Sequence, residues 1–134
     1  MSTALIISDD DVTATRTTAQ LEGMCFEVVV ATTESDVTHL CVASQPSLVI
    51  SDVETRGGIG FESIATVRRL IKDAYIIAIS RVSHQDLWLK VAGACGADDY
   101  VPGPLTTLSL VDAIEVRNEI TRSVFCLPEN TKLN

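Results

Sequence analysis

The chain has 134 residues, a length that suits one domain built on one hydrophobic core. Hydrophobic residues make up 46% and charged residues 21%, which is typical of a globular domain and excludes a disordered or fibrous chain. The net charge of −8 argues against direct binding to a nucleic-acid backbone. No apolar run reaches the roughly 20 residues that cross a bilayer, and the start lacks the basic flank of a signal peptide. We therefore expect a cytoplasmic protein without membrane contact.

Short apolar runs and helical patterns alternate from the first residues onward. Ala4–Ile7 is a continuous apolar run that predicts a buried parallel strand. Asp11 is a good helix cap, and the pattern after it predicts a helix over Val12–Gly23. The β-branched run Phe26–Ala31 predicts a second strand. A second helix is expected over Thr33–Ser44, with its first residue as the cap.

The middle of the chain repeats this alternation. Leu48–Ser51 predicts a third strand that runs into Asp52. Three glycines lie within Val53–Gly60, which indicates a loop without regular structure. A third helix is expected over Phe61–Lys72. Its inward side chains are predicted to be Ile64, Val67, Leu70 and Ile71.

The last third of the chain contains two further units. Tyr75–Ile79 predicts a fourth strand, and a fourth helix is expected over Ser83–Ala94 with its serine as the cap. Asp99–Val101 predicts a short fifth strand, and Thr106 or Thr107 opens the last helix.

Five strand–helix units in a row predict an α/β fold, a five-stranded parallel, doubly wound sheet with helices on both faces. Right-handed crossovers leave few ways to wind it, and we expect the flavodoxin-like strand order 2-1-3-4-5. The domain is expected to occupy residues 1–120. Residues 121–134 are expected to form the end of the last helix and a polar tail or the start of a linker.

The four cysteines are widely spaced and contain no CxxC pair. In a cytoplasmic chain, this spacing predicts small buried apolar side chains and argues against a zinc site or a disulfide framework. These residues are Cys25, Cys41, Cys95 and Cys126.

Polar side chains follow three of the predicted strands. Asp9 and Asp10 follow the first strand, Asp52 the third and Ser80 the fourth. In the flavodoxin-like order these strand ends share one edge of the sheet, where sites of such folds form. Carboxylates at close range repel one another or demand a cation, and Mg²⁺ prefers oxygen ligands. Carboxylate, cation and hydroxyl together predict a phosphoryl-accepting site. Asp9 and Asp10 also suit a helix start as simple caps, which is the alternative interpretation.

Four segments, in order, carry a resemblance to the receiver domains of bacterial-type response regulators. The resemblance covers the chain from residue 4 to about residue 118, and each segment alone is weak evidence for the family. The segments are Leu5–Asp11, Leu48–Val53 with Gly60–Glu62, Ile76–Ser80, and Gly93 with Gly96–Val101 and Pro104.

The resemblance implies that Asp52 accepts a phosphoryl group from the phosphohistidine of a histidine kinase. It also implies that Asp10, Asp52 and the Glu54 main-chain carbonyl bind Mg²⁺, with Asp9 acting through water. Ser80 would hydrogen-bond the phosphoryl group and let Tyr100 change rotamer.

The implied partners are proteins. A sensor histidine kinase or a phosphotransfer protein would supply the phosphoryl group. A downstream effector, or a second copy in a homodimer, would bind the face of the fourth helix, fifth strand and last helix. Neither nucleic acid nor a membrane is expected as a direct partner.

Four positions depart from the family pattern. Gly103 stands where the family has a lysine, so a cation that pairs with the phosphate is missing. One charge-assisted hydrogen bond contributes about 1.5–3 kcal/mol. Arg81 follows the switch serine, where the family has a small residue. By hypothesis its guanidinium replaces the missing lysine; the rival is that it obstructs the site or points to solvent. Arg56 and Ile59 replace the usual proline and aspartate of the loop after Asp52.

Two other classes of function fit parts of the sequence. A pseudo-receiver, which uses the same fold for protein contacts without phosphorylation, is favoured by Gly103, Arg56 and Arg81. A flavodoxin-like enzyme or nucleotide binder would need a phosphate-cradling loop after the first strand, where this chain has aspartates. The glycines of Gly57–Gly60 lack the GxGxxG spacing of a dinucleotide site.

Overall fold

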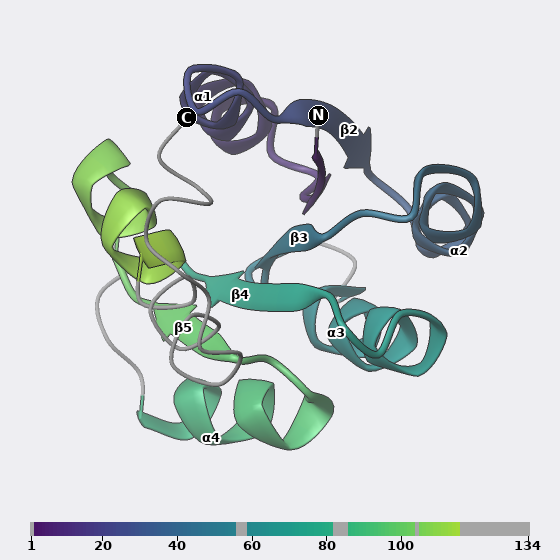
Figure 1. Ribbon diagram of the computed structural model, residues 1–134. Coiled ribbons are helices and arrows are strands. Elements are labelled where there is room, and N and C mark those ends of the chain that lie inside the picture. Colours follow the sequence, from purple (N-terminus) through teal and green to yellow (C-terminus); the bar gives the residue numbers. More distant parts are fainter. Residues whose placement is uncertain (1, 56–58, 82–85, 104, 116–134) are drawn as a thin grey trace, which may run out of the picture.

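The computed structural model describes residues 2–55, 59–81, 86–103 and 105–115. Strands and helices alternate along this part of the chain (Figure 1). The elements are β1 (Thr3–Ile7), α1 (Asp11–Glu22), β2 (Glu27–Ala31), α2 (Glu34–Ser44), β3 (Leu48–Asp52), α3 (Ile59–Leu70), β4 (Tyr75–Ile79), α4 (Asp86–Cys95), β5 (Asp99–Val101) and a last helix over 107–115.

The five strands form one parallel sheet in the order β2-β1-β3-β4-β5, which confirms the predicted fold class and strand order. β3 lies at the centre, and each of its residues is buried. The register pairs Ile7 with Ser51, and Asp52 with Ile79. The carboxyl ends of β1, β3 and β4 are therefore level with one another at one edge of the sheet.

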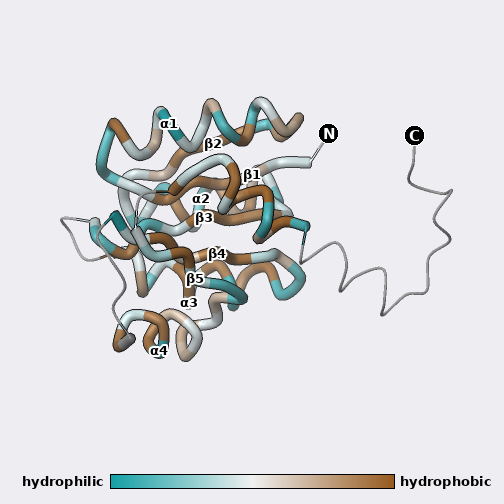
Figure 2. Tube along the Cα trace, turned by 90° about the vertical axis from the view of Figure 1, so that its left-hand side faces the viewer, coloured by the Kyte–Doolittle hydropathy of each residue, from teal (hydrophilic) through white to brown (hydrophobic). Residues whose placement is uncertain are grey.

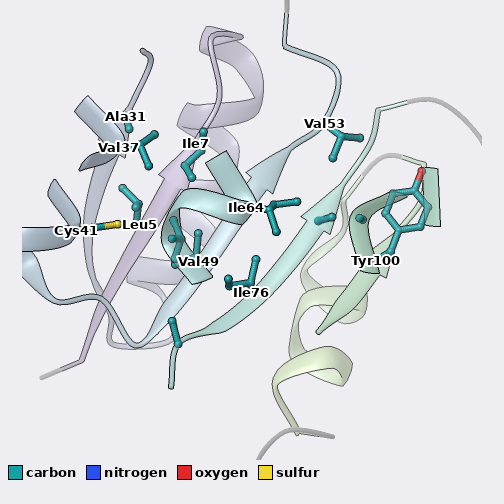
Figure 3. Close-up of a cluster of buried hydrophobic side chains, with 14 residues drawn as sticks. Leu5, Ile7, Ala31, Val37, Cys41, Val49, Val53, Ile64, Ile76 and Tyr100 are labelled. Atoms are coloured by element: carbon teal, nitrogen blue, oxygen red, sulfur yellow. The ribbon is translucent and has the colours of Figure 1, made fainter. Parts of the chain in front are cut away.

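Two hydrophobic clusters fill the two faces of the sheet, because successive strand side chains point to opposite faces. α2, α3 and α4 cover one face, and α1 and the last helix cover the other (Figure 1). Hydrophobic colour runs along the strands between these helices in Figure 2. The first cluster (Figure 3) includes Leu5, Ile7, Val37, Cys41, Val49, Ile64, Val67, Ile76, Ala92 and Tyr100. The second includes Ala4, Ile6, Leu21, Ile50, Ile77, Ile79, Leu105, Leu110 and Ala113.

Capping side chains open three helices. The prediction that Asp11 caps α1 was wrong: Asp10 is the cap, and its carboxylate accepts a hydrogen bond from the Thr13 main-chain N–H. Thr33 caps α2 as predicted. The Thr106 hydroxyl accepts from the main-chain N–H of Ser109 at the start of the last helix, so Thr106 rather than Thr107 opens it.

The predicted boundary of α3 was also wrong, because the helix begins at Ile59 instead of Phe61 and ends at Leu70. Gly60 is inside the helix, and its missing side chain allows a close approach. A Cβ built there would lie 2.3 Å from the Asp52 carbonyl oxygen. The Thr55 hydroxyl accepts from the main-chain N–H groups of Ile59 and Gly60 and so satisfies the helix start. The glycine at position 60 therefore allows close contact between α3 and β3, and it does not mark a loop.

Two side chains are more exposed than the sequence predicts. Cys25 is exposed in the turn after α1, with a positive φ of 71°, which contradicts the expectation of burial. Leu70 is 40% exposed, so the buried side of α3 does not include it as predicted. Arg56, Cys126, the predicted cap Ser83 and residues 121–134 lie outside the described residues. In the described part, no helix has the length and apolarity that a membrane crossing requires.

Candidate functional site

The sheet order brings the predicted polar residues to one edge of the molecule. Asp9 and Asp10 follow β1, Asp52 is the last residue of β3, and Ser80 follows β4. Because β1 and β4 both neighbour β3, Asp52 lies between the other two strand ends. Asp9 and Asp10 are half-buried, while Asp52 and Ser80 are buried.

The carboxyl group of Asp52 has no exposed surface and is held on both oxygens. The Ser8 hydroxyl donates to Oδ2 at 2.9 Å, and the Glu54 main-chain N–H donates to Oδ1 at 2.9 Å. Burial raises the pKa of Asp52, and the two hydrogen bonds and the nearby Arg81 oppose that rise. These contacts fix the plane of the carboxyl group at the end of the strand.

Ser8 is a site residue that the sequence did not reveal. Its hydroxyl is buried at the end of β1 and also accepts from the Asp10 main-chain N–H at 3.1 Å. The strand register reveals it, because Ile7 pairs with Ser51 and so the residue after Ile7 lies beside Asp52. Residue types and spacing alone did not include this register.

Asp10 caps α1 with one carboxylate oxygen and has the other near Arg81. Its Oδ2 accepts from the Thr13 main-chain N–H at 2.9 Å and from the Thr13 hydroxyl at 2.6 Å, which caps α1. Its Oδ1 faces the site and lies 3.8 Å from Nη1 of Arg81. The cap therefore orients the carboxylate and leaves one oxygen toward Asp52.

Arg81 points into the site and not away from it. Its Nη2 donates to the Glu54 main-chain carbonyl at 2.6 Å, and its Nε lies 3.6 Å from Oδ2 of Asp52. Its main-chain N–H donates to the Glu54 carboxylate. The Arg81 side chain is 42% exposed, so the guanidinium covers the buried carboxyl group from the solvent side.

Ser80 connects the edge of the sheet to β5. The Tyr100 hydroxyl donates to Oγ of Ser80 at 3.0 Å, and both side chains are buried. The Ser80 main-chain N–H donates to the Val101 carbonyl. Tyr100 belongs to the first cluster, with its hydroxyl at the end of the ring that Figure 3 shows.

Next to these groups lies a cavity of about 230 Å³ between α1 and β4. Arg16 and Arg81 line it, together with Asp10, Ser80 and Leu105. Gly103, which takes the place of the family lysine, has a positive φ of 78°.

Asp10, Asp52 and the Glu54 carbonyl meet around one guanidinium, so a cation at that point would have three oxygen neighbours. In the described part of the chain, no group of three or more His, Cys, Asp or Glu side chains could hold a metal ion. Two carboxylates and one main-chain carbonyl would leave further ligand positions of a cation to water.

Comparison with known proteins gives the family. The response regulator receiver domain model matches residues 4–115. The transcriptional regulatory protein AfsQ1 of Streptomyces coelicolor is 31% identical over 105 residues, which are 78% of this chain and 46% of AfsQ1. The chain thus spans about half the length of this curated relative.

Solved structures agree with this match. A response regulator of Burkholderia pseudomallei with a phosphorylated aspartic acid, a calcium ion and citrate is 25% identical, with a TM-score of 0.75 over 89% of this chain and 72% of that one. The fold is also that of Vibrio cholerae CheY4, which is 20% identical, with a TM-score of 0.77 over 86% of this chain and 97% of that one. Family match, relative and fold agree, and the chain belongs to the response regulator receiver domains of two-component signalling.

Proposed function

We propose that Asp52 accepts a phosphoryl group from a phosphohistidine of a sensor histidine kinase or a phosphotransfer protein. The observation that carries the proposal is the Asp52 carboxyl group, buried at the centre of the sheet edge with both oxygens held by hydrogen bonds. The Burkholderia pseudomallei relative, which has a phosphorylated aspartic acid, supports it. The expected cytoplasmic location stays a prediction.

In the proposed step an Asp52 oxygen bonds to phosphorus while the phosphorus–nitrogen bond to histidine breaks. The electron pair of that bond returns to the imidazole, which takes a proton from water. Ser8 and the Glu54 N–H orient the carboxyl group for this step. Ser80, at the neighbouring strand end, would donate to a phosphoryl oxygen.

Receiver domains generally bind Mg²⁺, and the oxygen groups present here fit such an ion. Asp10, Asp52 and the Glu54 carbonyl would hold it, with Asp9 acting through water. When bound, the ion would neutralise charge on the incoming phosphoryl group. The calcium ion of the Burkholderia pseudomallei structure supports a divalent-cation site.

Arg81 is proposed to supply the cation that Gly103 lacks. Its guanidinium already lies beside Asp52 and can present two N–H groups to a phosphoryl group. The rival hypothesis that Arg81 points to solvent disagrees with its observed contacts with Asp10, Asp52 and Glu54. Obstruction of the site remains the competing hypothesis.

The proposed output follows the contact between Ser80 and Tyr100. A phosphoryl group that takes the Ser80 hydroxyl would break its hydrogen bond from Tyr100 and change the face of α4, β5 and the last helix. Leu87, Leu89 and Leu108 are exposed on those two helices, at 68%, 46% and 70%. Apolar side chains in that position suit contact with an effector or a second copy of the chain.

The second candidate is a pseudo-receiver that signals without phosphorylation. Arg81 favours it, because its guanidinium gives Asp52 a counter-charge from within the chain. Gly103 favours it too, since it brings no side chain to the site.

An amide NMR titration separates the two candidates. Mg²⁺ is added first and then beryllofluoride, a mimic of an aspartyl phosphate, with Asp52→Asn as the control. Acceptance of phosphate predicts shifts at Asp10, Asp52 and Ser80 that reach Tyr100 and are absent in the control. No response to beryllofluoride at saturating Mg²⁺ would contradict phosphorylation and leave the pseudo-receiver.

A further inference from the structure

The three oxygen groups assigned to the metal are the three that Arg81 contacts. Nη2 donates to the Glu54 carbonyl at 2.6 Å, Nη1 lies 3.8 Å from Asp10 Oδ1, and Nε lies 3.6 Å from Asp52 Oδ2. Each guanidinium nitrogen thus faces a different member of the set. An ion that binds all three oxygens has to lie between them, where the guanidinium lies.

The position of Arg81 is set by more than these contacts. Its main-chain N–H donates to the Glu54 carboxylate, and Ser80 before it is buried and bonded to β5. The side chain therefore starts from a fixed point at the end of β4. A planar group with five N–H donors on that point matches several oxygen acceptors at once, which a compact ammonium group does not do.

Charge explains why a cation belongs there. Asp10 and the buried Asp52 approach one guanidinium, in a chain whose net charge is −8. Without a cation these two carboxylates would repel each other. Arg81 supplies the opposite charge from within the chain, so the site has a counter-ion before any metal arrives.

We propose that the Arg81 guanidinium is a tethered counter-ion that competes with Mg²⁺ for Asp10, Asp52 and the Glu54 carbonyl. Mg²⁺ binds oxygen at about 2.1 Å and needs these oxygens for itself, so it enters only when the Arg81 guanidinium gives up its contacts with them. This inference rests on the metal ligands of the proposed function. It adds that Arg81 controls the access of Mg²⁺ to those ligands. It gives the metal-free site a partial counter-charge from within the chain.

The test is metal binding in the absence of any phosphoryl donor. Mg²⁺ is titrated into the full chain and its Arg81→Gln and Arg81→Ala variants, and binding is followed by amide NMR shifts and by isothermal calorimetry. The glutamine variant keeps a polar side chain in case the alanine variant folds poorly. Loss of competing charge-assisted contacts is expected to lower the half-saturating Mg²⁺ concentration by about ten- to a hundredfold.

Arg16→Gln is the matched control, because Arg16 lines the same cavity from α1 and has the same charge. Competition for the ligands predicts a much smaller change in this variant than in Arg81→Gln. Equal Mg²⁺ affinity in the wild type and both Arg81 variants would overturn the inference, and so would equal gains from Arg16→Gln and Arg81→Gln. Neither result bears on whether Asp52 accepts a phosphoryl group, which the beryllofluoride titration decides at saturating Mg²⁺.

Discussion

The Asp52 side chain is shielded from water on all sides, and this sets the cost of its charge. Burial raises its pKa above the ordinary value, so the folded state favours the protonated form. A raised carboxyl pKa contributes stability below the ordinary pKa of about 3.9 and loses it as pH rises through the folded-state pKa. At neutral pH in metal-free buffer the ionised group therefore opposes folding.

Asp52→Asn is expected to increase the free energy of unfolding at pH 7, because the neutral amide avoids the cost of a buried charge. The gain should shrink as the pH falls toward 4 and vanish below it. Urea denaturation with EDTA across this pH range measures it. A variant that is less stable than the wild type at pH 7 would contradict the prediction.

The proposed role of Arg81 toward the phosphoryl group has its own measurement. At saturating Mg²⁺, where access of the metal no longer limits the step, Arg81→Ala is expected to slow phosphorylation of Asp52 by about ten- to a hundredfold, through loss of one charge-assisted contact. The rate is followed with a phosphoramidate donor. An unchanged rate and an unchanged phosphoryl lifetime would mean that Arg81 does not replace the missing lysine.

Among the individual site residues, the sequence identified Asp10, Asp52, Ser80 and Arg81 but not their contacts. Strand ends could be located from apolar runs, so the residues after them could be named. The Ser8 hydroxyl bond to Asp52 depends on register between β1 and β3, and the direction of Arg81 depends on a side-chain torsion. Neither leaves a trace in residue type or spacing.

The elements were predicted best where patterning alone decides them. All five strands were located because each is a short apolar or β-branched run in a buried sheet. The start of α3 was missed because a run of glycines usually indicates a loop. Gly60 is in the helix because only glycine can pack so closely against β3, and local helix propensity does not predict such a tertiary contact.

Tertiary contact also explains the role of Arg68, a basic residue in the last turn of α3. Its guanidinium donates to the carbonyl oxygens of Gly96, Lys72 and Ala74 and pairs with Asp98 at 2.7 Å. One side chain thereby joins the end of α3 to the turn before β5.

Gly60→Ala tests the contact of α3 with β3. A methyl group there would overlap the Asp52 carbonyl oxygen, so we expect a loss of about 1–3 kcal/mol or more in the free energy of unfolding. Gly93→Ala is the control, because a Cβ at this site in α4 meets no atom within 4 Å. It should be neutral or add up to about 1 kcal/mol. Equal effects of the two substitutions in urea denaturation would count against the contact.

For the whole molecule, the two hydrophobic clusters share one sheet and should unfold together. Leu110 is fully buried in the second cluster, and Trp88, the single tryptophan, packs against the first. Leu110→Ala is expected to lower the free energy of unfolding by about 2–5 kcal/mol. Tryptophan fluorescence should move with far-UV circular dichroism in one transition, although the substitution is on the other face.

Leu108→Ala, on the same helix but 70% exposed, is the companion variant and should change stability by less than about 0.5 kcal/mol. Should the tryptophan transition of Leu110→Ala remain at the wild-type denaturant concentration while the circular dichroism transition shifts, the faces would unfold separately.

The close contact of Gly60 with β3 also distinguishes the two flanks of Asp52, α3 on one side and the end of β4 on the other. Thr55, Ser51 and Gly60 are joined by hydrogen bonds behind the Asp52 main chain, with no room left for α3 to approach further. Arg81, on the other flank, is partly exposed and held mainly by polar contacts. We therefore expect that a group added to Asp52 would displace Arg81 and Ser80 and not α3, so that the change would run toward Tyr100.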